Sequence, residues 1–288
     1  MKSGTTIYLG GRFLAEGEEP LVSIFDRGYL LGDSVFATLH GYGEQVFAID
    51  AHLERFFAAA RAYRIRCPIG SEELRAVVTE AIRRSGARES AVRLTLTRGA
   101  GDGGFQQTGN EAPLLSVIAR PLTARASTPI STTILETRAL PPACSLVAHK
   151  AGSYATHVLA RAEATDRGFD DGIMLAATGE FVVSGTVANL FLVVDGRLVT
   201  PSTESGARPG VMRETVLRLA QEEGIASEVR TVAKGELNLA SELFFTSSLI
   251  EIQPIGSLDR MTVGSGTLPI TTRLQHALRR CVEGEVGS

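Results

Sequence analysis

The chain has 288 residues, of which 44% are hydrophobic and 21% charged, and its formal net charge is −3. This length allows one large domain or two modest domains with buried cores. No apolar run is long enough to predict a membrane span, and the slight negative charge argues against nucleic acid as a partner.

The first part of the chain predicts short strands that alternate with helices. Asp50 is expected to cap a helix at its start, and Gly86 is expected to end the next one. The expected elements, in chain order, are a Gly-Gly hairpin over 8–13, a strand over 45–49, a helix from Asp50 to about 63, a helix from Ser71 to Gly86, and strands over 91–99 and 114–122.

Residues 121–129 carry two prolines around small polar residues and predict a linker. Strands dominate beyond it. They are expected over 131–140, 172–177, 180–185, 189–194, 197–201 and 242–248, with helices from Tyr154 to Arg167, from Pro209 to near Gly224, and from Pro269 onward. The pattern predicts two α+β domains, 1–122 and 123–288, the second richer in strands.

Lysine is rare in this chain. Of 29 basic residues, only Lys2, Lys150 and Lys234 are lysines, and the other 26 are arginines. Arginine keeps its proton at working pH, whereas lysine can lose its proton when its surroundings lower its pKa. Lys150, in SLVAHKAGSY, follows apolar residues and is the best candidate for a reactive amine. The alternative is that Lys150 has no chemical role and is a lysine at a strand end that extends its amine into water.

Three other segments offer ligands for a phosphate. They are Arg55 on the first predicted long helix, the helix start at Val211 and Met212 with its free N–H groups, and the hydroxyls of Ser247 and Ser248 after an apolar strand. A reactive lysine and a phosphate cradle are what pyridoxal 5′-phosphate requires. Each segment also has an ordinary explanation: a surface arginine, a common helix start and a strand-end turn.

Other motifs predict no chemistry. The glycines between 99 and 104 do not match a phosphate loop, the five histidines lack metal-site spacing, and no GxSxG elbow occurs, so we expect no metal. The three cysteines, Cys67, Cys144 and Cys281, lie far apart without CxxC spacing. They argue against disulfides and indicate a reducing, cytoplasmic location.

Six motifs in this order resemble the class IV aminotransferases, the fold-type-IV pyridoxal-phosphate enzymes, which include branched-chain and D-amino-acid aminotransferases and aminodeoxychorismate lyase. The motifs are FDRGYLLGDSVFATL, HLERF, KAGSYATHVLARAEATDRGFDDGIML, SGTVANLFLV, RPGVMRE and ELFFTSSLIEIQPI. The resemblance covers nearly the whole chain. It implies a two-domain α+β fold, with a small N-terminal α/β domain and a larger domain with a barrel-like sheet.

The resemblance also implies roles for individual residues. Lys150 would form the Schiff base with pyridoxal 5′-phosphate, and Ser184 would lie by its ring. Arg55, Val211, Met212, Ser247 and Ser248 would hold the phosphate, and Phe36 and Thr38 would line the substrate pocket. Relatives are dimers that act on an amino donor and a keto acid acceptor, so a homodimer is expected.

The sequence departs from the family pattern at two places. Ser184 stands five residues before Asn189, where relatives carry a glutamate that keeps the pyridine nitrogen protonated. A ring that faces serine is a weaker electron sink. Residues 102–104 replace the arginine with which lyase and D-amino-acid relatives hold a substrate carboxylate, so that carboxylate must be bound elsewhere.

The sequence predicts an aminotransferase and leaves two alternatives open. The VMR segment and Phe36-Ala37-Thr38 also resemble an aminodeoxychorismate-type lyase, which eliminates pyruvate with the same lysine. Ser184 is the main support for a cofactor-binding protein with little turnover.

Overall fold

The computed structural model describes residues 4–101, 104–109, 111–123, 128–144 and 147–287. The chain divides into two compact units, Met1–Ala124 with His149–Ser153, and Arg125–Ala148 with Tyr154–Ser288. The segment that carries Lys150 thus belongs to the first unit, whereas the division predicted from the sequence places it in the second. Residues 124–127 of the predicted linker lie outside the described residues, and 1–122 and 123–288 stay a prediction as domains.

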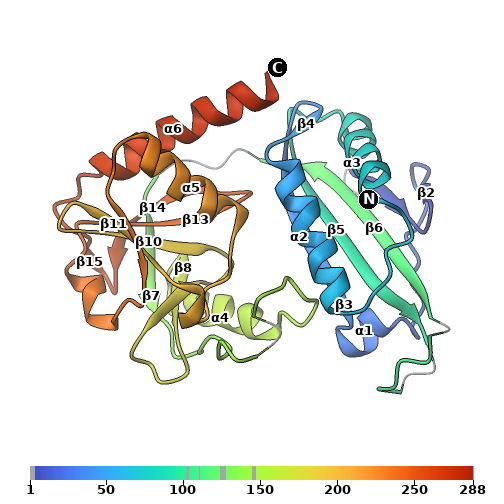
Figure 1. Cartoon of the computed structure of the whole chain (residues 1–288), viewed down its shortest axis with the longest axis horizontal. Helices are drawn as coiled ribbons and strands as arrows, with labels where there is room; N and C mark the ends of the chain where they lie inside the picture. The colour runs from blue at the N-terminus through green and yellow to red at the C-terminus, as the bar shows by residue number, and fades with distance from the viewer. Residues whose placement is uncertain (1–3, 102–103, 110, 124–127, 145–146, 288) are drawn as a thin grey trace. The chain divides into compact units, whose positions relative to one another are not determined.

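Within the described residues, the first unit is an antiparallel six-stranded sheet in the order β2-β1-β6-β5-β3-β4 (Figure 1). Its elements are β1 (Thr6–Leu9), β2 (Arg12–Phe13), α1 (Arg27–Leu31), β3 (Ser34–Tyr42), β4 (Gln45–Val46), α2 (Ile49–Ala62), α3 (Ser71–Ser85), β5 (Glu89–Ala100) and β6 (Ala112–Pro121).

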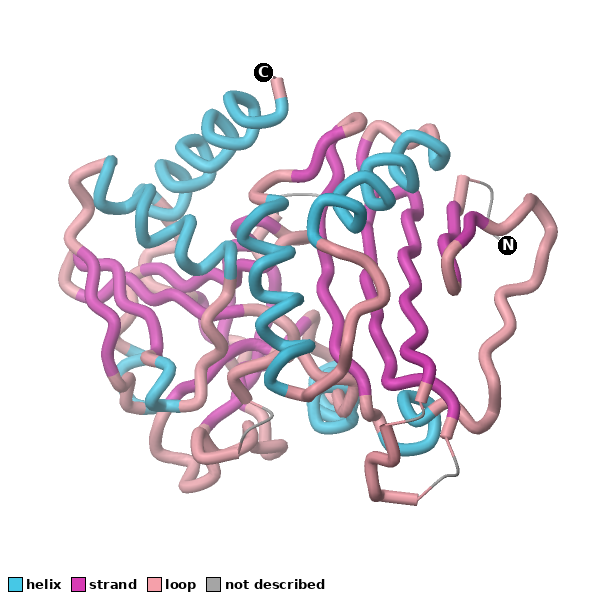
Figure 2. The backbone as a smooth tube through the Cα atoms, turned by 45° about the vertical axis from the view of Figure 1, so that its right-hand side comes forward, coloured by secondary structure: helices cyan, strands magenta, loops and turns pink. Residues whose placement is uncertain are grey.

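Helices α2 and α3 lie over one face of this sheet, as Figure 2 shows. Alternate strand residues such as Val35, Leu39 and Leu94 pack there against Leu53 and Phe56 of α2. Because side chains alternate along a strand, the residues between them point to the other face. One face of the sheet is therefore the core, and the other is left for polar side chains.

The helix ends show which local predictions hold. Gly86 ends α3 in the left-handed conformation, at a φ of 62°, as predicted. The prediction that Asp50 caps the preceding helix is wrong: Ala48 is the N-cap, and Asp50 lies in the first turn of α2. A carboxylate in the first turn still favours the helix through its dipole, which explains why the residue signals a helix start.

The second unit is built on a nine-stranded sheet in the order β12-β11-β10-β13-β14-β7-β8-β9, with β15 paired to β14, among the described residues. Its elements are β7 (Ile130–Ile134), α4 (Ala155–Asp166), β8 (Asp171–Leu175), β9 (Val182–Gly185), β10 (Asn189–Val194), β11 (Arg197–Pro201), the 3₁₀ turn η1 (Thr203–Ser205), α5 (Val211–Glu222), β12 (Ser227–Arg230), the 3₁₀ turn η2 (Lys234–Asn238), β13 (Glu242–Ser247), β14 (Glu251–Leu258), β15 (Met261–Thr262) and α6 (Pro269–Val286).

Most strands of the second unit match their predicted ranges, with one clear exception. The strand predicted over 131–140 is wrong beyond Ile134, where β7 ends. The chain turns there, and the guanidinium of Arg138 donates to the carbonyl of Leu135. Two long strands, β3 and β14, were not predicted, because their polar residues mask the alternation that marks a strand.

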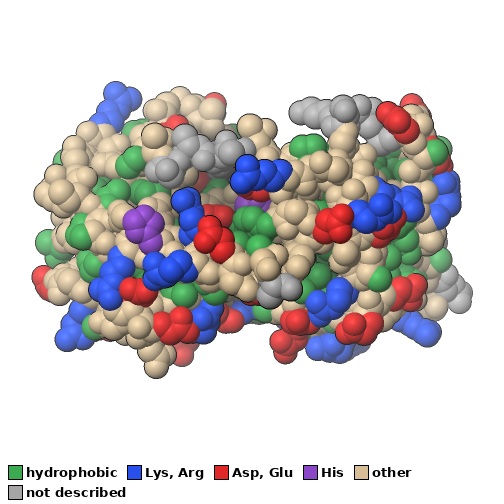
Figure 3. All heavy atoms as spheres, turned by 90° about the horizontal axis from the view of Figure 1, so that it is seen from above, with side chains coloured by type: hydrophobic (Ala, Val, Ile, Leu, Met, Phe, Trp, Pro, Cys, Tyr) green, Lys and Arg blue, Asp and Glu red, His purple; other side chains and the backbone are tan. Residues whose placement is uncertain are grey.

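None of the helices in the described part of the chain is long and apolar enough to span a membrane. On the face seen in Figure 3, acidic and basic side chains are interspersed, as the small net charge leads one to expect.

Candidate active site

Lys150 lies in a short extended segment along the edge of β3, at the end of the strand away from β4. The Phe36 N–H donates to the Lys150 carbonyl at 2.8 Å, and the Gly152 N–H donates to the Ser34 carbonyl at 2.8 Å. Ala151 pairs with Val35, whose side chain points into the core. Lys150 therefore points to the face of the sheet opposite the core, where its Nζ lies 5.4 Å from the centre of the Phe36 ring.

Gly152 makes this close edge contact possible. A Cβ at position 152 would lie 2.1 Å from Ser34 Oγ, which no side chain can tolerate without displacement. The glycine of the KAG motif is thus explained by the approach of the lysine segment to β3.

The register of β3 and β5 places a polar group of side chains beside Lys150. Phe36 pairs with Thr95, and Thr38 pairs with Arg93, so all four side chains share one face. The Arg93 guanidinium carbon lies 3.4 Å from the centre of the Phe36 ring, and Arg93 Nε donates to Thr95 Oγ1 at 3.4 Å. Burial lowers the pKa of Arg93 to about 10.

Arg93 is a candidate that the sequence did not reveal. It is one of 26 arginines and occupies an alternating position of a strand, which a solvent-facing side chain would also occupy. Only the pairing with β3 shows that it lies over Phe36, on the face that carries Lys150. A half-buried guanidinium whose hydrogen bond to a described side chain is a long one, to Thr95 Oγ1, is suited to bind a carboxylate.

Helix α2 places a second cation near Lys150. His52 and Arg55 are one turn apart and share a helix face. Burial, and then the positive charges of Lys150 and Arg55, lower the pKa of His52 to about 3. The imidazole is therefore neutral at physiological pH, and Lys150 and Arg55 both lie close enough to His52 for their charges to act on it.

The second unit carries the residues predicted to hold a phosphate at the start of α5. Gly210 is the N-cap and has no side chain with which to cap the helix, so the N–H groups of Val211 and Met212 lie in the first turn, where they have no acceptor within the helix. A Cβ at Gly210 would lie 2.2 Å from Asn189 Oδ1, so β10 and the helix start are in direct contact.

The end of β13 lies beside this helix start. Asn189, which touches Gly210, pairs across the sheet with Thr246 of β13, and Ser247 and Ser248 follow directly. The donors that meet here are main-chain N–H groups and half-buried hydroxyls. This set fits the phosphate of pyridoxal 5′-phosphate, because a helix N-terminus with neutral donors binds a phosphate anion.

Ser184 lies on β9 and pairs with Met174 of β8. Its half-buried hydroxyl donates to the Gly185 carbonyl at 2.9 Å. Gly185 itself approaches Phe245 of β13 so closely that a Cβ would lie 2.7 Å from the ring. Glu180, the acidic residue nearest before it in the chain, is exposed in the turn that precedes β9.

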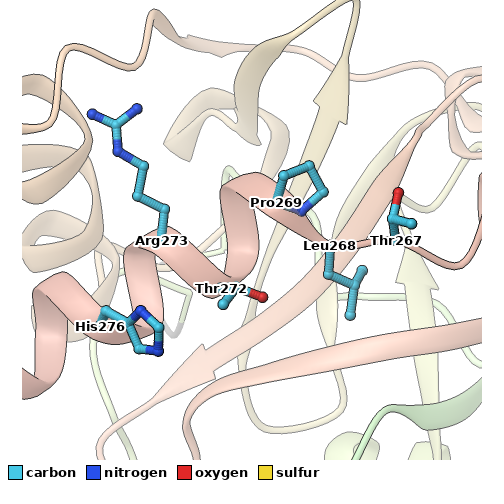
Figure 4. Close-up of a pocket in the computed structure, with 6 residues that line it drawn as sticks. All are labelled: Thr267, Leu268, Pro269, Thr272, Arg273 and His276. Atoms are coloured by element: carbon cyan, nitrogen blue, oxygen red, sulfur yellow. The ribbon is translucent and has the colours of Figure 1, made fainter.

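A separate hollow of about 640 Å³ lies along the first turns of α6 (Figure 4). It is lined by Thr267, Leu268, Pro269, Thr272, Arg273 and His276. The N–H groups at the start of α6 already have an acceptor, because the buried Glu242 carboxylate accepts from the N–H groups of Ile270 and Thr271. Glu242 begins β13, whereas the cradle lies at its other end, so the hollow is not part of the candidate site.

Comparison with known proteins identifies the family. The family Amino-transferase class IV matches residues 34–258. A putative branched-chain-amino-acid aminotransferase of Methanocaldococcus jannaschii is 34% identical over 275 residues, covering 95% of each chain. The crystal structure of the Escherichia coli branched-chain amino acid aminotransferase has a TM-score of 0.91 at 28% identity, covering 97% of this chain and 95% of that one.

A third relative was solved with a B6 vitamer. The branched-chain amino acid aminotransferase of T.th. with pyridoxamine 5′-phosphate has a TM-score of 0.90 at 26% identity, covering 97% of this chain and 96% of that one. It was also solved with 4-methylvaleric acid and with N-(5′-phosphopyridoxyl)-L-glutamate.

The chain belongs to the class IV aminotransferases. It has their α+β fold with two curled sheets, and it is an aminotransferase that depends on pyridoxal phosphate, as the motifs predicted.

Proposed function

We propose that this enzyme moves the amino group of an apolar, branched α-amino acid to an α-keto acid. The named relatives are branched-chain aminotransferases, and one of them binds both 4-methylvaleric acid and a glutamate adduct. Phe36 supplies an apolar wall for such a side chain, and Arg93 over its ring supplies a cation for a carboxylate. One face of the sheet thus offers contacts for an apolar and an acidic substrate.

The residues of the two units take distinct roles in this proposal. Pyridoxal phosphate, when bound, supplies an aldehyde for the substrate amine and a ring that withdraws electrons from Cα. Lys150 Nζ would hold the aldehyde when substrate is absent, and would then take the proton from substrate Cα and deliver it to the cofactor carbon that carried the aldehyde. Arg55, Val211, Met212, Ser247 and Ser248 hold the phosphate, Ser184 faces the ring, and Phe36 and Thr38 line the substrate pocket.

A homodimer is part of the same proposal. Large apolar side chains are exposed along residues 21–30 and at Phe105. The two segments are neighbours, because the buried Arg27 guanidinium donates to the Phe105 carbonyl at 3.3 Å. A second copy of the chain is a suitable cover for such a patch.

We also propose a cytoplasmic location, in keeping with the free thiols of Cys67, Cys144 and Cys281.

The observation that carries the proposal is the position of Lys150, beside Phe36 and on the same face as Arg93. The test is a half-reaction with the wild-type holoenzyme and Lys150→Ala. We expect leucine, isoleucine or valine to bleach the cofactor absorbance and yield pyridoxamine phosphate, and the variant to lose at least about a thousandfold in rate.

Other outcomes of this experiment decide against the proposal. Release of pyruvate and 4-aminobenzoate from aminodeoxychorismate without a keto acid acceptor would establish the lyase. No spectral response to any amino acid, with cofactor bound, would indicate a binding protein with little turnover.

A further inference from the structure

Arg208 lies two residues before the N-cap of α5, in the segment that leads to the phosphate cradle. Its backbone is fixed on β10, because Asn189 Nδ2 donates to the Arg208 carbonyl at 2.8 Å. The side chain is half-buried. Arg208 therefore combines an anchored main chain with a guanidinium that reaches other segments of the second unit.

The guanidinium contacts the chain on both sides of Lys150. Arg208 Nε donates to the Val147 carbonyl at 3.3 Å, and Arg208 Nη1 donates to the Tyr154 hydroxyl. The guanidinium carbon also lies 5.2 Å from the centre of the Tyr154 ring. Val147 stands three residues before Lys150 and Tyr154 four residues after it, so one side chain holds both ends of the segment that carries the amine.

Tyr154 is itself held in place, which gives the contact with Arg208 a fixed partner. Its ring is stacked on His157 at a centroid distance of 4.4 Å. His157 Nδ1 donates to the Thr186 carbonyl at 2.7 Å, in the turn between β9 and β10. The far end of the lysine segment is therefore tied to the sheet as well as to Arg208.

We propose that Arg208 is a positioning residue for Lys150, which acts by holding Val147 and Tyr154 as the two ends of the lysine segment. Fixing both ends of a short loop removes most of its conformational freedom and keeps the amine near its reacting geometry. A guanidinium suits this role, because its N–H groups point to several partners at fixed angles, whereas an ammonium is a single point.

The inference rests on the proposed role of Lys150 and goes beyond it. It separates two events that a cofactor-binding site combines: retention of the phosphate, which depends on the cradle, and capture of the aldehyde, which depends on the lysine. Loss of the Arg208 side chain should impair the second event and spare the first.

The experiment compares Arg208→Met, Arg208→Lys and Tyr154→Phe with the wild-type protein. Arg197→Met is the matched control, since Arg197 is an exposed arginine of the same unit that pairs with Glu228. The first readout needs no cofactor. We expect amide hydrogen exchange within 147–154 to become about tenfold faster in Arg208→Met, with the strands of the sheet unchanged.

The second readout is capture of the cofactor. Pyridoxal phosphate is mixed with each apoprotein, the product is fixed with borohydride, and the amount attached at Lys150 is followed by peptide mass. We expect capture about tenfold slower in Arg208→Met, a smaller loss in Tyr154→Phe, which keeps the Val147 contact, and partial recovery in Arg208→Lys. The dissociation constant of pyridoxamine phosphate, which carries no aldehyde, should change less than about threefold.

Three outcomes would overturn the inference. They are unchanged exchange and capture in Arg208→Met, an equal loss for both vitamers, which would place Arg208 in the phosphate cradle, and the same loss in Arg197→Met. Should Arg208→Met fail to fold, Tyr154→Phe and Arg208→Lys carry the same test. Failure of wild-type protein to attach cofactor at Lys150 would instead reject the proposed function.

Discussion

The two units carry different kinds of candidate groups. On the first unit, the candidate groups are cations: Lys150 and Arg93, which lie near the apolar Phe36 ring, and Arg55, whose charge acts on His52. On the second, they are neutral: main-chain N–H groups at the start of α5 and the hydroxyls of Ser247, Ser248 and Ser184.

This difference sets what each unit is sensitive to. Burial lowers the pKa of Arg93. Burial also lowers the pKa of His52, and the nearby charges of Lys150 and Arg55 lower it further. A cradle of backbone donors carries no titratable group and depends instead on the exact path of the chain, here on the contact of Gly210 with Asn189. The first unit should thus respond to changes of charge, and the second to changes of shape.

The sharpest test of the charged unit is Arg93→Met, which keeps most of the side-chain volume and removes the charge. We expect kcat/KM for a dicarboxylic keto acid to fall about a hundredfold, since a buried carboxylate loses its partner. Stopped-flow rates with the pyridoxamine form measure this effect. Arg120→Met is the control, because Arg120 is exposed on the same sheet. Equal loss in both variants, or none in Arg93→Met, would remove Arg93 from the site.

The corresponding test of the neutral unit is Gly210→Ala. The new methyl group would collide with Asn189 Oδ1, so the start of α5 must shift. We expect the dissociation constant of pyridoxamine phosphate to rise about tenfold, because the helix N–H groups no longer converge on the phosphate. Fluorescence titration measures it. Gly235→Ala is the control, since a Cβ there meets nothing within 4 Å; a rise of the same size in it would contradict the cradle.

Acid stability tests the charge effect without any ligand. Folding lowers the pKa of His52 from its ordinary value of 6.5 to about 3. Between these pH values, His52 is therefore protonated in the unfolded chain and neutral in the folded chain. The stabilisation by neutral His52 is complete above pH 6.5 and declines as the pH falls toward 3, by at most about 1.4 kcal/mol per pH unit.

Urea unfolding of apoprotein between about pH 7.5 and 4.5 measures this decline. We expect a shallower loss of stability in His52→Gln than in the wild-type protein. His276→Gln should keep the wild-type slope, because His276 is exposed. Parallel curves for wild type and His52→Gln would show that His52 titrates alike in the folded and unfolded states.

The smallest effect expected is that of placing a charge in the neutral unit. Ser184→Glu restores the carboxylate that relatives carry at this position, and a protonated ring withdraws electrons better. We expect the half-reaction to be a few times faster. Ser184→Ala is the matched variant, which removes the hydroxyl and supplies no charge. No gain in Ser184→Glu with cofactor bound would show that the missing carboxylate does not limit the rate.

Local signals in the sequence predicted most of the elements correctly. Gly86 ended its helix as expected, because a left-handed residue is a local requirement. The strand over 131–140 was wrong beyond Ile134, and the cap at Asp50 was wrong, since the turn after β7 and a left-handed Ala48 depend on the surrounding chain. The strand β3 was not predicted, although it carries Phe36 and Thr38.

By itself, the sequence determined the family and predicted the reactive amine and the phosphate-binding segments, because their motifs are short and each residue type has few chemical uses. Only the tertiary structure decided that Arg93 lies over Phe36, that His52 lies near Lys150, and that Arg208 holds both flanks of the lysine segment. These contacts join residues far apart in the chain. They follow from strand register and burial, and the identity of an arginine or a histidine in the sequence does not indicate which residue it will contact.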